Sequence, residues 1–221
     1  MAGMTTQNRA SGTLTELLSD GVVLCLRFGP GQAAVEAGRA AVRGGLKVLE
    51  ITLTTPGALE IIATLARDPG VIAGAGTVLT AEAARDVARA GGRFALSPVF
   101  DPAMLDEAAR RDLLAIPGAA TPTEILAAHR HGAQVVKVFP SGTLGGPPYL
   151  RFVRGPLPQI RLLPTSGPTS ENLADYMDAG AVAVGIGAEV YPPGFTLESV
   201  EAAARRVRRA MDTWRAAHPA R

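Results

Sequence analysis

The stretch Gln134-Val135-Val136-Lys137-Val138-Phe139-Pro140 places one charged side chain inside an apolar run. A run of this kind is typical of a buried parallel β-strand. Charged groups are rarely buried without a partner, and burial favours the neutral form of a lysine. A neutral amine attacks a ketone and forms a Schiff base. The alternative is a lysine near a strand end whose head group reaches water.

Seven more apolar runs occur along the chain, separated by alanine-rich amphipathic stretches. The eight predicted strands span residues 22–27, 47–53, 71–75, 93–97, 113–117, 134–139, 161–164 and 181–186. Predicted helices include 32–43, 58–67 and 81–90, and Thr-x-x-Glu helix starts occur at Thr13 and Thr121. Eight strand–helix units predict an α/β fold, a single (β/α)8 TIM barrel with a short N-terminal helix. An open doubly wound sheet is the alternative, disfavoured because no Gly-x-Gly-x-x-Gly follows the first strand.

Composition supports one intracellular domain. Of 221 residues, 47% are hydrophobic and only 5% aromatic, which suits parallel strands covered by helices. No linker divides the chain, so we expect a flexible tail at 1–11 and one barrel domain at 12–221. The single cysteine, Cys25, and the lack of a membrane-spanning run favour a cytoplasmic location. A net charge of +2 without a basic stripe argues against nucleic acid as a partner.

Active sites of such barrels lie at the carboxyl ends of the strands. On the second predicted strand, Glu50 lies between Leu49 and Ile51, where an unpaired carboxylate is costly to bury. A barrel interior that holds Glu50 and Lys137 would place a carboxylate near an amine, a pair that suits imine formation and proton transfer. The alternative is a buried ion pair that only fixes strand register.

Other strand ends carry groups that can bind anions. Arg27 ends the first strand. Its guanidinium is expected either to bind a substrate carboxylate or to lie in solvent. Backbone N–H groups and a hydroxyl are available at Gly74-Ala75-Gly76-Thr77. Thr165-Ser166-Gly167 and Gly187-Ala188 follow the last two strands, where barrels often bind phosphate, although glycine turns are also common without a ligand. No histidine lies at a strand end and no Asp/His set is present there, so we predict neither a metal nor another cofactor.

Further motifs lie in the same order between Val22 and Tyr191. They are Leu49-Glu50-Ile51-Thr52-Leu53, Gly74-Ala75-Gly76-Thr77-Val78, Ser97-Pro98, Ile116-Pro117-Gly118, Thr121-Pro122-Thr123-Glu124, Lys137-Val138-Phe139-Pro140, Gly155-Pro156 and Pro164-Thr165. This series resembles the 2-keto-3-deoxy-6-phosphogluconate (KDPG) and 4-hydroxy-2-oxoglutarate (KHG) aldolase family. A close relative in the family acts on 2-keto-3-deoxy-6-phosphogalactonate.

The resemblance implies a metal-independent class I aldolase, typically a homotrimer. Its substrate would be a 2-keto-3-deoxy-6-phospho sugar acid or 4-hydroxy-2-oxoglutarate, cleaved reversibly to pyruvate and glyceraldehyde 3-phosphate or glyoxylate. By this likeness Lys137 is the Schiff-base lysine and Glu50 the general acid/base. Gly76 and Thr77 would hold the pyruvyl carboxylate. The pocket residues would be Phe139, beside the imine, together with Pro98 and Thr54.

Three departures from the family pattern concern anion binding. Thr54 stands where some relatives have an arginine, so Arg27 is assigned to the substrate carboxylate. Ser166 stands where relatives commonly have glycine, and costs about 1 kcal/mol if its φ is positive. Ala188 replaces a common serine. Two alternatives therefore remain: an aldolase for a different or unphosphorylated 2-keto acid, and a catalytically silent barrel that binds a keto acid. A metal-dependent barrel epimerase is disfavoured because ligands are lacking.

Overall fold

Parallel strands alternate with helices along the chain. The computed structural model describes residues 8–29 and 33–219. Its strands are β1 (Val22–Leu26), β2 (Val48–Thr52), β3 (Ile72–Gly76), β4 (Phe94–Leu96), β5 (Leu114–Ile116), β6 (Gly118–Ala119), β7 (Val136–Val138), β8 (Leu162–Pro164) and β9 (Val184–Ile186). Its helices are α1 (Arg9–Asp20), α2 (Ala34–Arg43), α3 (Ala58–Leu65), α4 (Ala81–Arg89), α5 (Pro102–Arg110), α6 (Pro122–Arg130), α7 (Gly146–Arg154), α8 (Leu173–Asp178) and α9 (Leu197–Ala217). Each of the eight predicted strands overlaps an observed one, so the predicted α/β class is confirmed.

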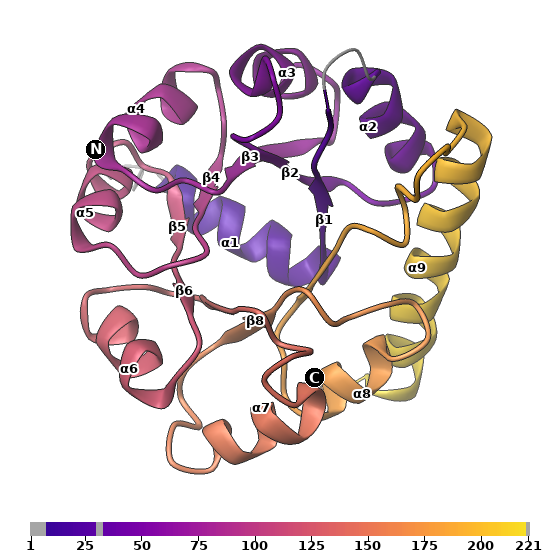
Figure 1. Cartoon of the computed structure of the whole chain (residues 1–221). Coiled ribbons are helices and arrows are strands. Elements are labelled where there is room, and N and C mark those ends of the chain that lie inside the picture. Colours follow the sequence, from indigo (N-terminus) through magenta and orange to yellow (C-terminus); the bar gives the residue numbers. More distant parts are fainter. Residues whose placement is uncertain (1–7, 30–32, 220–221) are drawn as a thin grey trace, which may run out of the picture.

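The strands form two parallel sheets that curl around a common interior. One sheet has the order β5-β4-β3-β2-β1-β9 and the other β6-β7-β8. Only Pro117 separates β5 from β6, and a proline has no N–H to continue a ladder. At the opposite edges Thr165 bridges Gly185, next to β8 and β9. Helices α2 to α9 surround the strands in Figure 1, and none of the described helices has the length and hydropathy needed to cross a bilayer.

Local signals explain where helices begin, with one error in the prediction. The capping box is confirmed at α6, where the Thr121 hydroxyl accepts from the Glu124 N–H and the Glu124 carboxylate accepts from the Thr121 N–H. The predicted start at Thr13 is wrong, because α1 begins at Arg9, with Asn8 as its N-cap. The Asn8 side chain accepts the first free N–H groups, which lets the helix start five residues earlier than a helix capped by Thr13. The predicted tail at 1–11 is therefore too long, and residues 1–7 lie outside the described residues.

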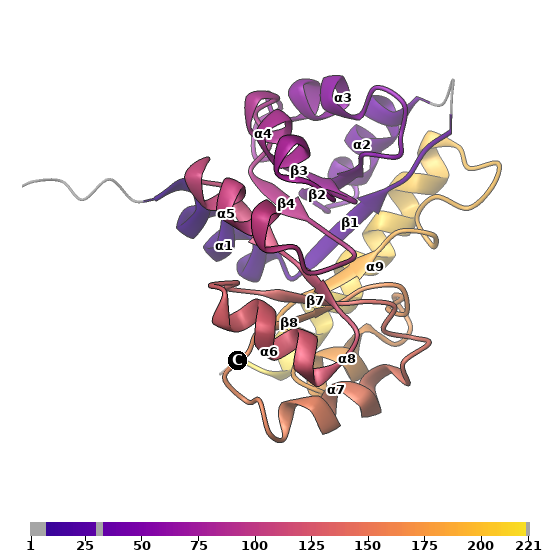
Figure 2. The ribbon, with the colours of Figure 1, turned by 60° about the vertical axis from the view of Figure 1, so that its left-hand side comes forward.

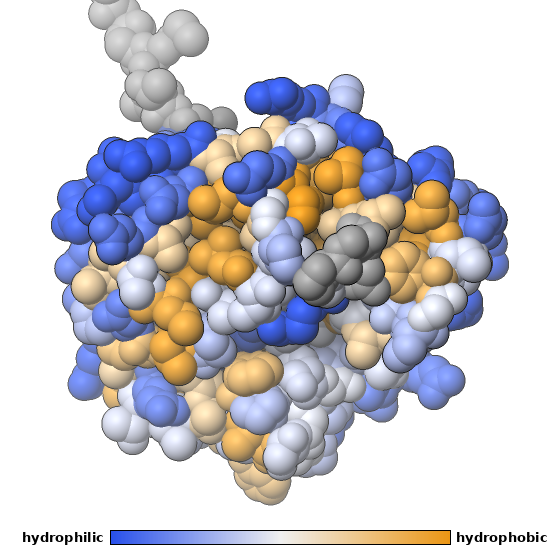
Figure 3. All heavy atoms as spheres, turned by 45° about the horizontal axis from the view of Figure 1, so that its top comes forward, coloured by the Kyte–Doolittle hydropathy of each residue, from blue (hydrophilic) through white to orange (hydrophobic). Residues whose placement is uncertain are grey.

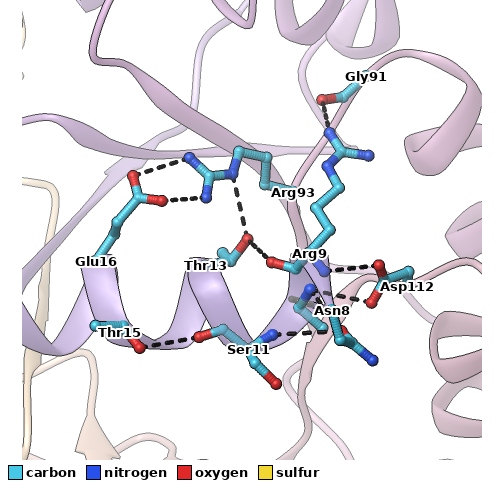
Figure 4. A network of polar contacts seen from close by, with 10 residues as sticks. Asn8, Arg9, Ser11, Thr13, Thr15, Glu16, Gly91, Arg93 and Asp112 are labelled. Atoms are coloured by element: carbon cyan, nitrogen blue, oxygen red, sulfur yellow. Dashed lines mark hydrogen bonds and ion pairs between the residues drawn. The ribbon is translucent and has the colours of Figure 1, made fainter. Parts of the chain in front are cut away.

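Helix α1 covers the amino ends of the strands. Arg93, just before β4, donates to the hydroxyl of Thr13 at 3.2 Å and pairs with the carboxylate of Glu16 (Figure 4). The carboxylate of Asp112, just before β5, accepts the Arg9 N–H at 2.7 Å. The helix lies across the strands in Figure 1 and at one end of them in Figure 2. This end of the interior is therefore closed, and a ligand must enter at the carboxyl ends.

An apolar layer fills the interior above α1. Its members face inward from most of the strands and pack against two leucines of α1: Leu14, Leu17, Val23, Val48, Ile72, Phe94, Leu96, Leu114, Ile116, Val135, Leu163 and Ala183. Side chains two residues further along a strand point to the same side. Glu50 lies two residues after Val48, and Lys137 lies two residues after Val135. Both charged side chains therefore point into the interior next to the apolar layer, on its carboxyl side.

Candidate active site

A cavity of about 460 Å³ lies at the carboxyl ends of the strands. Its walls come from β1, β2, β7 and the segments after β8 and β9, and its lining residues are Cys25, Arg27, Glu50, Lys137, Phe139, Thr165, Ser166, Gly167, Pro168, Thr169, Gly185, Gly187, Ala188 and Glu189. The structure thus brings together the residues predicted for catalysis and for phosphate binding, which are up to 138 positions apart in the sequence, between Glu50 and Ala188.

The two predicted catalytic side chains are both buried in this cavity. Lys137 is 5% exposed and Glu50 is 1% exposed. The Nζ atom of Lys137 lies 5.0 Å from the ring centroid of Phe139, in the geometry of a cation–π contact. In the sheet, Glu50 is the register partner of Cys25 on β1 and of Gly74 on β3. The alternative that Lys137 lies near a strand end with its head group in water is therefore wrong.

The electrostatics of Glu50 suit proton transfer. Burial raises the pKa of the Glu50 carboxyl, and the nearby Lys137, Cys25 and Arg27 offset part of that increase. Among the described residues, Glu50 has no ion-pair partner, and its Oε2 atom has no hydrogen-bond partner. A raised pKa and a free oxygen suit this carboxyl to both accepting and donating a proton.

The end of β3 supports the carboxylate of Glu50. A side chain on Gly76 would overlap with Oε1 of Glu50, so only a glycine leaves room for the carboxylate. The next residue, Thr77, has a φ of +59°, which is strained for a β-branched residue. Neither residue lines the cavity in the described structure, so their predicted role with the pyruvyl carboxylate stays a prediction.

Arg27 reaches the cavity wall, but two predicted pocket residues do not. The Arg27 guanidinium donates to the hydroxyl of Thr54 at 2.7 Å, so Thr54 holds the arginine from outside the wall. The carbonyl group of Pro98 lies against Gly118, the register partner of Lys137. Thr54 therefore lies one contact away from the cavity, through Arg27, and Pro98 lies two contacts away, through Gly118 and Lys137.

Ser166, which stands where relatives commonly have glycine, adopts a strained backbone conformation. Its φ is +61°, in the left-handed region that favours glycine. A serine here costs roughly 1 kcal/mol relative to an unstrained conformation. Ser166 still lines the cavity, together with Thr165, Gly167, Gly187 and Ala188.

Sequence reasoning missed five lining residues: Cys25, Pro168, Thr169, Gly185 and Glu189. Cys25 could have been found, because it shares a face of β1 with Arg27 by the two-residue period. Burial raises the pKa of the Cys25 thiol, which keeps it protonated and a weak nucleophile. Glu189 lies in the segment after β9, where no strand or helix period predicts the direction of a side chain.

A buried amine beside a buried carboxyl, at the carboxyl ends of parallel strands, defines a class of enzymes that bind their substrate as an imine. Residues 16–204 match the family model for KDPG and KHG aldolase, and the chain belongs to this family. It is similar to the KHG/KDPG aldolase of Escherichia coli K12, with 36% identity over 167 residues, 75% of this chain and 78% of that protein. The family resemblance seen in the sequence is confirmed.

Solved structures agree with this assignment. The 2-keto-3-deoxy-6-phospho-gluconate aldolase of Zymomonas mobilis has a TM-score of 0.81 and 30% identity, with 88% of this chain and 95% of that chain covered. The KDPG aldolase of Legionella pneumophila, captured with pyruvate as a covalent carbinolamine intermediate, has a TM-score of 0.78 and 27% identity, with 92% and 99% covered. The chain is accordingly a lyase, a class I aldolase that releases pyruvate and an aldehyde.

We predict that Glu50→Gln lowers kcat by about 10²–10⁴-fold, the usual contribution of a general acid/base, and does not destabilise the fold. A carboxyl whose pKa is raised on folding loses stabilising free energy as the pH rises through the raised value. The free energy of unfolding of the variant, measured in urea, should therefore increase relative to that of the parent protein as the pH rises above 4.5, the ordinary glutamate value. A strongly destabilised variant would instead support a structural ion pair.

We predict that Gly76→Ala lowers kcat by about 100-fold or more, because the added methyl group displaces the Glu50 carboxylate by about an ångström. Gly12→Ala is the matched control, since a side chain on Gly12 in α1 meets no heavy atom within 4 Å. Steady-state release of pyruvate measures both variants. Full activity of Gly76→Ala would contradict the placement of the Glu50 carboxylate.

Proposed function

We propose that this chain reversibly cleaves a 2-keto-3-deoxy-6-phospho sugar acid, or 4-hydroxy-2-oxoglutarate, to pyruvate and glyceraldehyde 3-phosphate or glyoxylate. The observation that carries the proposal is the shared burial of Lys137 and Glu50 in one cavity, with a carboxylate oxygen left free. The names of the relatives in Escherichia coli and Zymomonas mobilis supply the substrate class.

The proposed mechanism begins at the substrate ketone. The Lys137 amine attacks C2, and loss of water gives a protonated imine. Glu50 takes the proton of the C4 hydroxyl as the C3–C4 bond breaks, and the bonding electrons move into the iminium to form an enamine. The aldehyde leaves, C3 of the enamine accepts a proton, and water hydrolyses the imine to release pyruvate and the free amine.

The positions of the other predicted residues support assigned roles. Arg27 lines the cavity and is held by Thr54, so we assign its guanidinium to the substrate carboxylate. We assign Gly76 and Thr77 to the same carboxylate by the family resemblance. Phe139 packs beside Lys137, where its ring covers the imine. The segments after β8 and β9 enclose the end of the substrate that lies away from its carboxylate.

We further propose that the two sheets form one closed (β/α)8 barrel. Counting β5 and β6 as a single strand broken at Pro117 gives eight strands. The bridge between Thr165 and Gly185, and the N–H of Val182 donating to the carbonyl of Leu162 at 3.0 Å, support closure between β8 and β9. The cytoplasmic location stays a prediction.

We predict that borohydride reduction in the presence of pyruvate attaches a pyruvate adduct to Lys137. The chain has only two lysines, and Lys47, exposed just before β2, lies at the amino ends of the strands. Lys47→Arg should therefore keep the adduct and the activity, whereas Lys137→Arg should lose both, because a guanidinium is not nucleophilic. Peptide mass mapping locates the adduct.

Two results would count against this mechanism. An adduct divided between both lysines would show that Lys137 has no special reactivity. A folded protein without any adduct would favour a barrel that binds a keto acid without turnover. Activity should also survive EDTA, because the mechanism requires no metal; loss of activity that added metal restores would favour a metal-dependent reaction.

We also propose a homotrimer, in line with the family resemblance. Leu79 and Val99 are each 49% exposed and follow the neighbouring strands β3 and β4. Hydrophobic residues (orange) gather in patches between hydrophilic ones (blue) on the face shown in Figure 3. We predict a mass three times that of one chain by light scattering, and a shift to smaller species for Leu79→Lys combined with Val99→Lys. A monomer in the parent protein would refute the trimer.

A further inference from the structure

A second cavity, of about 420 Å³, lies at the amino end of β9, away from the active site. Its walls come from the last turns of α1, α7, α8 and α9 and from residues 180–182, which lead into β9. Helices α7, α8 and α9 follow one another around this part of the molecule in Figure 1. The two cavities share no lining residue, so this one is separate from the site that holds Lys137 and Glu50.

Most of the wall of this second cavity is apolar, and its largest side chain is held in place. The Trp214 indole N–H donates to the Asp178 carboxylate at 2.8 Å, and the Trp214 ring stacks on His218 at 4.8 Å. Two other wall residues, Leu18 and Val182, also pack against the apolar layer of the interior. A cavity of this size with apolar walls and a few polar groups is typical of a site for a small organic ligand.

The charged lining residues of the described cavity are both cations, Arg154 and Arg215. Within the described ranges Arg154 has neither an ion-pair nor a hydrogen-bond partner, and its Nε atom is buried. Its guanidinium packs against Gly180, where any side chain would overlap with Nη1. Arg215 donates to the carbonyl of Leu18 at 3.0 Å and pairs with no carboxylate of the same residues. Cations beside an apolar wall without an anionic partner are costly, and a bound anion would remove that cost.

The helix ends explain the position of Arg215 but not that of Arg154. Both arginines lie in the last turns of their helices, where the partial negative charge of the carbonyl end favours a cation. Arg215 uses this charge directly through the Leu18 carbonyl. Arg154 donates to no carbonyl of the described chain, so its guanidinium keeps donors for a ligand. The same helix ends disfavour a dianion, so a single carboxylate fits the site better than a phosphate.

We propose that this second cavity binds a small organic carboxylate with an apolar body. The planar guanidinium of Arg154 donates two parallel hydrogen bonds to the carboxylate, and Arg215 adds a second positive charge. The apolar body packs against Trp214 and Val182. The inference does not depend on the proposed aldol cleavage, because none of these residues lines the active-site cavity.

The fluorescence of Trp214 reports on the proposed site, because Trp214 is the only tryptophan of the chain. We expect cyclohexanecarboxylate to change this fluorescence with a saturable titration curve. Cyclohexanecarboxamide has the same shape without the charge and should bind about tenfold more weakly or worse, because charge-assisted hydrogen bonds are roughly twice as strong as neutral ones. Inorganic phosphate lacks an apolar body and should also bind more weakly. No saturable change with the carboxylate, or equal affinity for either of the other two probes, would overturn the proposal.

A variant of Arg154 tests which group binds the carboxylate. Arg154→Met keeps an unbranched side chain against Gly180 but removes the guanidinium, and should weaken the binding of cyclohexanecarboxylate by about tenfold or more. Arg151→Met is the control, because Arg151 is exposed on the same helix and does not line the cavity, and it should leave the affinity unchanged. Unchanged affinity in Arg154→Met would overturn the assignment. If Arg154→Met fails to fold, the comparison of carboxylate and carboxamide in the parent protein still decides.

A final titration separates the second cavity from the active site. Parent protein in which borohydride has fixed pyruvate on Lys137 should bind cyclohexanecarboxylate with unchanged affinity. Loss of binding in that adduct would place the carboxylate in the active-site cavity and overturn the proposal of a separate site. A failure to form the adduct would count against the imine mechanism alone, since the titrations of the parent protein and of Arg154→Met do not require it.

Discussion

The burial of Lys137 and Glu50 in one cavity is the constraint on which the rest of the structure depends. Two charged groups removed from water cost folding free energy that their mutual attraction does not fully recover. Here they do not even form a direct ion pair within the described structure. The carboxyl keeps a free oxygen and a raised pKa. Reactivity at this position is therefore maintained at the expense of stability, and the surrounding fold must supply the difference.

The fold supplies the missing stabilising free energy through the apolar layer and through the closure of the interior at the amino ends of the strands. Val48 and Val135 stand two residues before the charged pair and belong to the apolar layer. Helix α1 covers the amino ends of the strands through Arg93, Glu16 and Asp112 (Figure 4). Because water and substrate can then enter from one side only, the amine and the carboxyl face the same ligand.

The active-site cavity has two distinct ends. Lys137, Glu50 and Phe139 lie within the residues 16–204 that match the KDPG and KHG aldolase family model. At the other end Ser166 holds a strained φ, and Glu189 accepts the backbone N–H of Ser170.

The sequence by itself determined the α/β alternation, the approximate positions of most strands and the two buried charged groups, because the two-residue period and apolar flanks are local signals. It missed the true start of α1, since Asn8 caps the helix by a contact that no apolar pattern reveals. Only the tertiary structure decided that Glu189 meets Ser170 and that Gly76 makes room for Glu50. Those contacts join residues from separate strands and loops, and their distances depend on how the whole chain packs.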